Sequence, residues 1–232
     1  MIPADQREAA TARLPAMKPV QGSWITVDDA YTAQLDEKAR LMRENRAAVC
    51  AVTDGAEPAV LELLDLIVGQ GPFVRTGDKL TRPDGVVVDI DRDDPFLTLS
   101  QLVTEDLCIL EKRGEEHVLT AALLCFPAAW TLAEKIGKPL TRIHVPVPPY
   151  DDNIARRVQR LFDGIQPGRP IWRANLHTYE EPDLFHVRGE SDPRPYTNIK
   201  ARFERSERQT VLRLPSSGAV LFAIHTCMVA LP

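Results

Sequence analysis

Hydrophobic residues return at a helical spacing through the first quarter of the chain. From Asp28 to about Val52 they recur with a period near 3.6 residues, and the aspartate at the start can cap a helix. A second helical run extends from Glu57 to Val68, with Pro58 tolerated in its first turn and Gly69 directly after its end. The pattern therefore predicts two helices in this part of the chain.

The middle of the chain changes from a loop-like to a strand-like pattern. Residues from Pro72 to Pro95 are rich in glycine, proline and aspartate and hold one short apolar strand, Val86 to Ile90, which is typical of a surface excursion. A third helix is expected from Pro95 to about Asp106. Two apolar runs, Leu107 to Glu111 and Val118 to Cys125, flank a polar turn and predict a β-hairpin.

The second half combines helices with longer strands. Helices at about Ala128 to Ile136 and Asp151 to Ile165 precede an alternating strand, Pro170 to Tyr179. A long hairpin, Ala201 to Leu214 and Ala219 to Ala230, follows. Strands that pair through hairpins, with helices before and between them, predict an α+β fold with an antiparallel sheet covered by helices on one face.

The composition is that of an ordinary soluble domain. The 232 residues are 44% hydrophobic and 26% charged, for which one domain is the default expectation. A net charge of −5, with 28 basic residues spread along the chain, argues against a nucleic-acid partner. The apolar runs are too short to span a bilayer and the N-terminus lacks a signal-peptide pattern, so we expect a cytoplasmic protein without a membrane partner.

Several common chemistries are not indicated by the sequence. The four cysteines form no CxxC pair, so neither a zinc nor an iron–sulfur site is expected, and we interpret all four as structural thiols. There is no GxSxG elbow, no P-loop and no GxGxxG after a strand. Direct binding of NADPH or ATP is therefore not expected.

One histidine stands in a proline-rich segment. His144 lies in the run Ile143 to Tyr150, where the prolines fix φ near −65° and bias the residues before them toward extended conformations. A side chain in such a stiff segment is suited to act as a metal ligand. A lone histidine is also commonly a hydrogen-bonded structural residue, and His225, at the end of an apolar strand, is the alternative ligand.

A second candidate is the run from Glu207 to Thr210. In a strand, Glu207 and Gln209 point to one face and the residues that alternate with them point to the other, so at most half of the run can face a pocket. One interpretation gives Glu207 a role in a binding site. The other is a solvated strand with cross-strand ion pairs among Arg202, Glu204, Arg205 and Arg208.

Three blocks of the chain together resemble a known family. They are Leu102 to Leu110, Phe126 to Tyr150 and Glu207 to Phe222. In this order they resemble the alpha subunit of the haem-dependent oxidative N-demethylases, over most of the chain. The family's characterised member has a PAS-like sheet that binds haem. The resemblance thus implies a single PAS-like haem-binding domain over residues 1–232, with an N-terminal helical extension.

The resemblance also implies a reaction and roles for individual residues. The characterised member oxidises dimethylamine, a small secondary amine, with oxygen and with electrons from separate flavin and iron–sulfur subunits. His144 would be the axial ligand, and Glu207 would hold the substrate ammonium and accept its proton. Tyr150 and Tyr196 are the candidates to donate to bound oxygen. The expected haem-binding residues are His144, Arg173, Lys135, Asn175 and Arg208, with Arg173 and Lys135 pairing with the propionates. A haem-based gas or redox sensor and a haem-free ligand-binding domain are the alternative functions.

Overall fold

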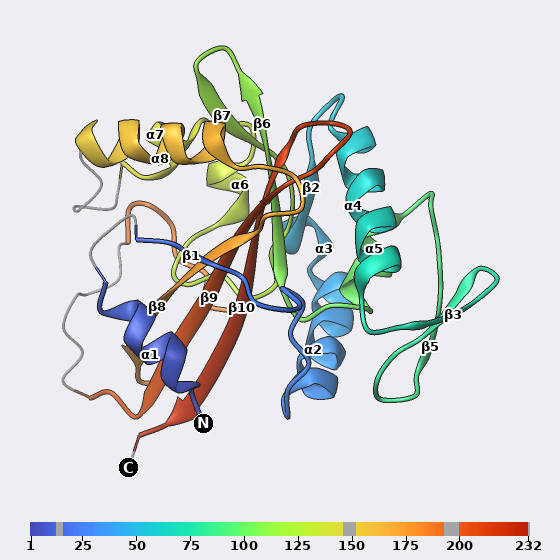
Figure 1. The fold of residues 1–232 in the computed structure, drawn as a ribbon. Coiled ribbons are helices and arrows are strands. Elements are labelled where there is room, and N and C mark those ends of the chain that lie inside the picture. Colours follow the sequence, from blue (N-terminus) through green and yellow to red (C-terminus); the bar gives the residue numbers. More distant parts are fainter. Residues whose placement is uncertain (13–15, 146–151, 193–199, 232) are drawn as a thin grey trace.

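A computed structural model describes residues 1–12, 16–145, 152–192 and 200–231 (Figure 1). The helices are α1 (Ala4–Ala10), α2 (Tyr31–Glu44), α3 (Arg46–Val49), α4 (Glu57–Gln70), α5 (Pro95–Ser100), α6 (Leu132–Lys135), α7 (Leu140–Ile143) and α8 (Asp152–Gly164). The strands are β1 (Lys18–Pro19), β2 (Cys50–Val52), β3 (Val74–Thr76), β4 (Lys79–Thr81), β5 (Val87–Asp89), β6 (Asp106–Arg113), β7 (Glu116–Leu123), β8 (Ile171–Tyr179), β9 (Phe203–Arg213) and β10 (Val220–Ala230). In this part of the chain the fold is α+β, as predicted.

The main sheet has the strand order β1-β8-β9-β10-β6-β7-β2, and all its pairings are antiparallel. Both predicted hairpins are confirmed, β6 with β7 and β9 with β10. Sequence-adjacent strands with a tight turn pair readily because little chain entropy is lost in closing the loop. The less local pairing of β8 with β9 sets Asn175 directly opposite Glu207.

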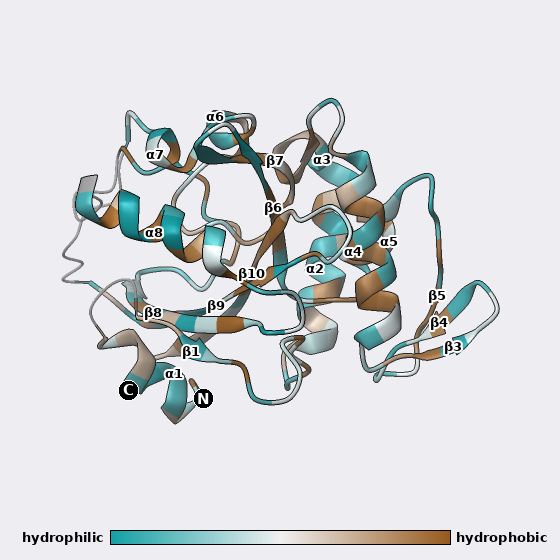
Figure 2. Ribbon diagram, turned by 45° about the horizontal axis from the view of Figure 1, so that its top comes forward, coloured by the Kyte–Doolittle hydropathy of each residue, from teal (hydrophilic) through white to brown (hydrophobic). Residues whose placement is uncertain are grey.

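Helices cover both faces of the main sheet, so the expectation of one covered face is wrong (Figure 1). One face packs against α2, α4 and α5, and the other packs against α6, α7 and α8. The reason is visible in β6, where five consecutive residues from Asp106 to Leu110 are buried rather than alternate ones. Figure 2 shows this strand as largely hydrophobic between the two groups of helices.

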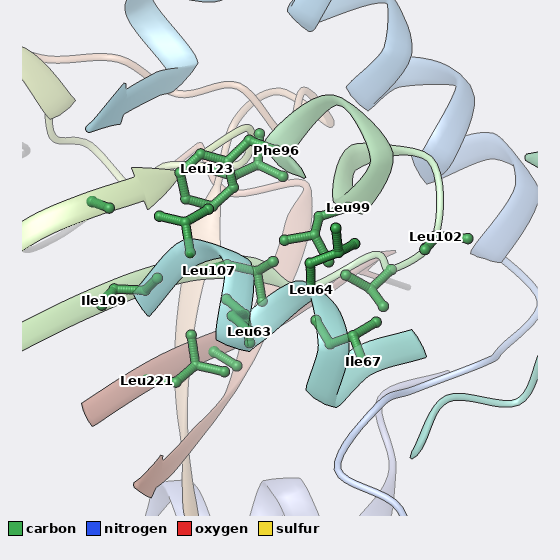
Figure 3. Close-up of a cluster of buried hydrophobic side chains, with 14 of the residues drawn as sticks. Leu63, Leu64, Ile67, Phe96, Leu99, Leu102, Leu107, Ile109, Leu123 and Leu221 are labelled. Carbon is green, nitrogen blue, oxygen red and sulfur yellow. The ribbon is translucent and has the colours of Figure 1, made fainter. Parts of the chain in front are cut away.

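The larger core lies between the sheet and α4 and α5 (Figure 3). The side chains labelled in Figure 3 come mainly from two helices and three central strands, and each of them is at most 2% exposed. Full burial of one leucine contributes about 1.5–3 kcal/mol, so this layer fixes the sheet on which the polar residues discussed below are placed. The side chains labelled in Figure 3 are Leu63, Leu64, Ile67, Phe96, Leu99, Leu102, Leu107, Ile109, Leu123 and Leu221.

The first predicted helix is shorter than expected. It ends at Glu44, because the next residue, Asn45, has a φ of −136° and leaves the helical region, and the chain then makes the single turn α3 before β2. Cys50 of β2 pairs with Leu123 of β7, which adds a strand to the edge of the sheet. Sheet pairing of this segment thus overrides its helical periodicity.

Three other predicted elements also change. The helix expected at about Ala128 to Ile136 is confined to Leu132–Lys135, because Ala128 pairs with His186 in a β-bridge and Ala129 has a φ of 64°. The excursion from Pro72 to Pro95 folds into a three-stranded sheet, β3-β4-β5, rather than holding one strand, because Leu80 and Val88 are buried beneath it. The helix expected to reach Asp106 ends at Ser100, and Asp106 begins β6 instead. In the described residues, no helix is long and apolar enough to cross a membrane.

Candidate functional site

Strands β8 and β9 bring three of the predicted site residues together on one face of the sheet. Arg173 and Asn175 of β8 lie opposite Gln209 and Glu207 of β9. Asn175 Nδ2 donates to Glu207 Oε2 at 2.8 Å, Gln209 Nε2 donates to the same oxygen at 3.1 Å, and Arg173 Nη1 donates to Gln209 Oε1 at 2.9 Å. We call these four side chains the β8–β9 polar cluster. The predicted pairing of Glu207 and Gln209 on one face is confirmed.

Arg205 completes the surroundings of Glu207. It is 1% exposed, and its Nη2 lies 3.2 Å from Glu207 Oε1. The guanidinium also donates to the backbone carbonyls of Phe126 and Leu184. The interpretation of this strand as solvated is therefore wrong for this face, because the chain segments that carry these carbonyls cover it. Sequence reasoning missed Arg205 as a site residue, although its position two residues before Glu207 places it on the same face.

Arg208 lies on the opposite face of the sheet. Its guanidinium packs over the ring of Trp172, 5.2 Å from the ring centroid, and Nη1 is 3.5 Å from the carbonyl oxygen of Trp24. Burial lowers the pKa of Arg208. The expected haem-binding residues therefore do not all lie on one face of the sheet, because Arg208 lies opposite the face that carries Arg173 and Asn175.

His144 directly follows α7 and does not adopt the extended conformation expected of it. Its φ and ψ are −95° and 2°, and its backbone N–H donates to the carbonyl of Leu140 at 3.2 Å. The physical reason is that a proline restricts the residue immediately before it, which here is Val145 and not His144. The prolines at positions 146, 148 and 149 lie outside the described residues, as do Tyr150 and Tyr196.

The imidazole of His144 is held in one tautomer. Nδ1 lies 2.8 Å from the carbonyl oxygen of Leu140, and a carbonyl oxygen can only accept, so Nδ1 carries the proton. Burial, with a smaller contribution from the charge of Lys135, lowers the pKa of His144, while the bond to Leu140 opposes this shift. The lowered pKa favours the neutral ring, in which the lone pair is on Nε2.

Lys135 is close to His144 but already has an ionic partner. Its Nζ donates to the carbonyl of Ile143 at 2.9 Å and pairs with Glu190 at 2.7 Å. Glu190 also pairs with Arg142 at 2.9 Å, and Arg142 and Lys135 together lower its pKa to about 2. Lys135 thus binds the last residue of α7, Ile143, and so helps to position the backbone of the next residue, His144.

The alternative ligand, His225, lies on the face opposite the β8–β9 polar cluster. It is paired with Arg208 across the strands and is 3% exposed. Its Nε2 lies 3.3 Å from Asp28 Oδ2, and this contact is the main reason that the pKa of Asp28 is lowered. His225 therefore joins β10 to the segment before α2.

All four cysteines are free, and burial raises the pKa of the Cys108 and Cys125 thiols. Among the described residues, no group of three or more His, Cys, Asp and Glu side chains could hold a metal ion.

A comparison with protein families gives one match that spans nearly the whole chain. The family model described as haem-dependent oxidative N-demethylase, alpha subunit-like, matches residues 16–232. This range includes both hairpins, α7 with His144, and the β8–β9 polar cluster. The chain belongs to the haem-dependent oxidative N-demethylase, alpha subunit-like, family.

Proposed function

We propose that this protein is the haem-binding catalytic subunit of a multi-subunit oxidase that demethylates a small secondary amine such as dimethylamine. The family supports haem-dependent oxidative N-demethylation. The observation that carries the proposal for this chain is the buried carboxylate of Glu207, held by two amide side chains on a half-buried polar face. We also propose that the main sheet and its helices form a PAS-like domain.

The residues present suit haem in two respects. A neutral imidazole, with Nδ1–H fixed by a carbonyl and its lone pair on Nε2, is the form in which histidine ligates iron, so His144 would hold the haem iron. Arg173 is half-buried, and no carboxylate of the described residues lies within ion-pair distance of it. Burial lowers the pKa of Arg173, and an anionic propionate would compensate its charge.

Two other expected haem contacts fit less well. Lys135 would have to leave Glu190 to reach a propionate, and Arg208 lies on the other face of the sheet. Asn175 remains a proposed neighbour of the cofactor because it shares a face with Arg173. Bound haem would supply the iron at which oxygen is activated.

Glu207 can bind a protonated amine without losing its present contacts. Its carboxylate accepts hydrogen bonds from Asn175, Gln209 and Arg205. A carboxylate offers about four acceptor positions, so one remains for an N–H of the substrate. A charge-assisted hydrogen bond of this kind is worth about 1.5–3 kcal/mol. The Glu207 carboxylate would also accept the proton released when the amine nitrogen is oxidised.

Tyr196 is proposed to donate a hydrogen bond to bound oxygen. The electrons would come from separate flavin and iron–sulfur subunits, since the sequence carries no nucleotide-binding motif of its own.

The proposal is tested with the purified, haem-loaded protein, oxygen, dimethylamine and an artificial reductant. Demethylation consumes one oxygen molecule, two electrons and two protons, and it yields methylamine, formaldehyde and water. We expect formaldehyde and methylamine in equal amounts, with no product when haem or the reductant is omitted. Loaded and reducible haem without any product would exclude this activity.

A further inference from the structure

We propose that Arg205 is a positioning residue for Glu207, fixing the direction in which the carboxylate faces the amine. This inference rests on the proposed function, in which Glu207 binds the substrate. Arg205 itself does not contact the amine in this account.

Backbone atoms hold Arg205 in place independently of Glu207. Its Nη1 donates to the carbonyl of Leu184 at 3.0 Å, and its Nη2 donates to the carbonyl of Phe126. The guanidinium also lies 5.6 Å from the centroid of the Tyr179 ring. A planar guanidinium with several fixed acceptors has little freedom to turn. It is therefore a rigid point of attachment for a flexible glutamate.

Phe126, whose carbonyl Arg205 binds, is also held through its backbone N–H. The backbone N–H of Phe126 donates to Asp106 Oδ2 at 2.7 Å, and that of Cys125 donates to Asp106 Oδ1 at 2.8 Å. Lys38 of α2 lies 3.9 Å from Asp106 Oδ1, and both side chains are fully buried. Two cations and two anions thus alternate from α2 to Glu207, which is how so many buried charges are tolerated.

Arg205 and the amides divide the two oxygens of Glu207 between them. Arg205 binds Oε1, whereas Asn175 and Gln209 bind Oε2, so the plane of the carboxylate is determined. Without the cation, a carboxylate buried to this degree is destabilised in its charged form. Loss of Arg205 would therefore remove the contact that orients Oε1 and the cation that compensates the buried carboxylate.

A double-mutant cycle on amine affinity tests this role. The affinity of the haem-loaded protein for dimethylamine hydrochloride is measured by calorimetry for Arg205→Met, for Glu207→Gln and for both together. We expect Arg205→Met to weaken binding by about tenfold or more in the wild-type background and to have no further effect beside Glu207→Gln. Arg205→Lys should recover part of the loss. Arg202→Met, which removes an exposed arginine paired with Glu181, is the control and should bind normally.

Two outcomes would overturn the proposal. The first is an equal loss from Arg205→Met in both backgrounds, since Arg205 would then act independently of Glu207.

If the wild-type protein binds no amine, the proposed function fails, and the same cycle is measured by urea unfolding. Arg205→Met should then raise the unfolding constant by about 100-fold, and adding Glu207→Gln should recover part of it. Strictly additive effects on unfolding would be the second contradicting outcome.

Discussion

Asn175 and Glu207 are joined by two hydrogen bonds across directly paired positions of β8 and β9. Asn175 Nδ2 donates to Glu207 Oε2 at 2.8 Å, and the Glu207 backbone N–H donates to Asn175 Oδ1 at 3.1 Å. One amide side chain therefore orients the carboxylate and at the same time holds its main chain. The identity of residue 175 consequently matters for both the side chain and the main chain of Glu207.

Replacing this amide by a carboxylate reverses its effect. Asn175→Asp should place two carboxylates within hydrogen-bond distance, which share a site only if one takes up a proton. We expect the affinity for a protonated amine to fall about tenfold or more, and the free energy of unfolding to fall by about 1–3 kcal/mol. Calorimetry and urea unfolding measure the two effects. Asn153→Asp, at an exposed position of α8, is the matched control, and an unaltered Asn175→Asp protein would disprove this role.

Glu207→Gln keeps the shape of the side chain and removes its charge. If the amine binds as a cation beside this residue, affinity and demethylation should fall together by roughly 10- to 150-fold, which corresponds to about 1.5–3 kcal/mol. The haem spectrum without substrate should remain that of the wild type. The exposed Glu181→Gln serves as the control. Unchanged amine binding would return Glu207 to a purely structural role, and loss of haem would make it a support of the pocket.

The stability of the protein should decrease in mild acid partly through His117. This residue is 1% exposed, its Nδ1 lies 2.8 Å from Gln159 Oε1, and burial is the main reason that its pKa falls below the ordinary 6.5. The unfolded chain therefore binds a proton at this position at a pH where the folded chain does not. By linkage, its contribution to stability is present above about pH 6.5 and decreases as the pH falls below that value.

Urea unfolding across this pH range measures the effect. His117→Gln should show a shallower loss of stability in acid than the wild type, although it is less stable at neutral pH. Equal slopes for the two proteins would contradict the assignment of this pH dependence to His117.

The sequence predicted which site residues share a face of their strand, but not which residues they contact on the neighbouring strand. The period of two along a strand predicted that Glu207 and Gln209 share a face, and the same rule applies to Arg173 and Asn175. The register that sets Asn175 against Glu207 depends on two strands separated by a long connection, which no local pattern encodes. Arg205 was overlooked because arginine is seldom fully buried, and only the surrounding carbonyls make its burial possible.

Local rules also failed where tertiary contacts outweighed them. The helical periodicity predicted a helix up to Val52, but the helix ends at Glu44 and the residues Cys50–Val52 pair with β7 as strand β2. The stiffening effect of prolines was assigned to His144, whereas α7 and the contacts of Lys135 determine its backbone. The tautomer of His144, on which its suitability as a ligand depends, follows from a hydrogen bond that the sequence does not reveal.

The absorption spectrum of the purified protein titrated with haem tests the central claim most directly. We expect a saturable Soret band for the wild type and for His225→Ala, and an abolished or strongly shifted band for His144→Ala. The two variants remove the same side chain from different elements, the end of α7 and strand β10, so each is the control for the other. A wild-type protein that binds no haem, or a band lost in His225→Ala and kept in His144→Ala, would contradict the account.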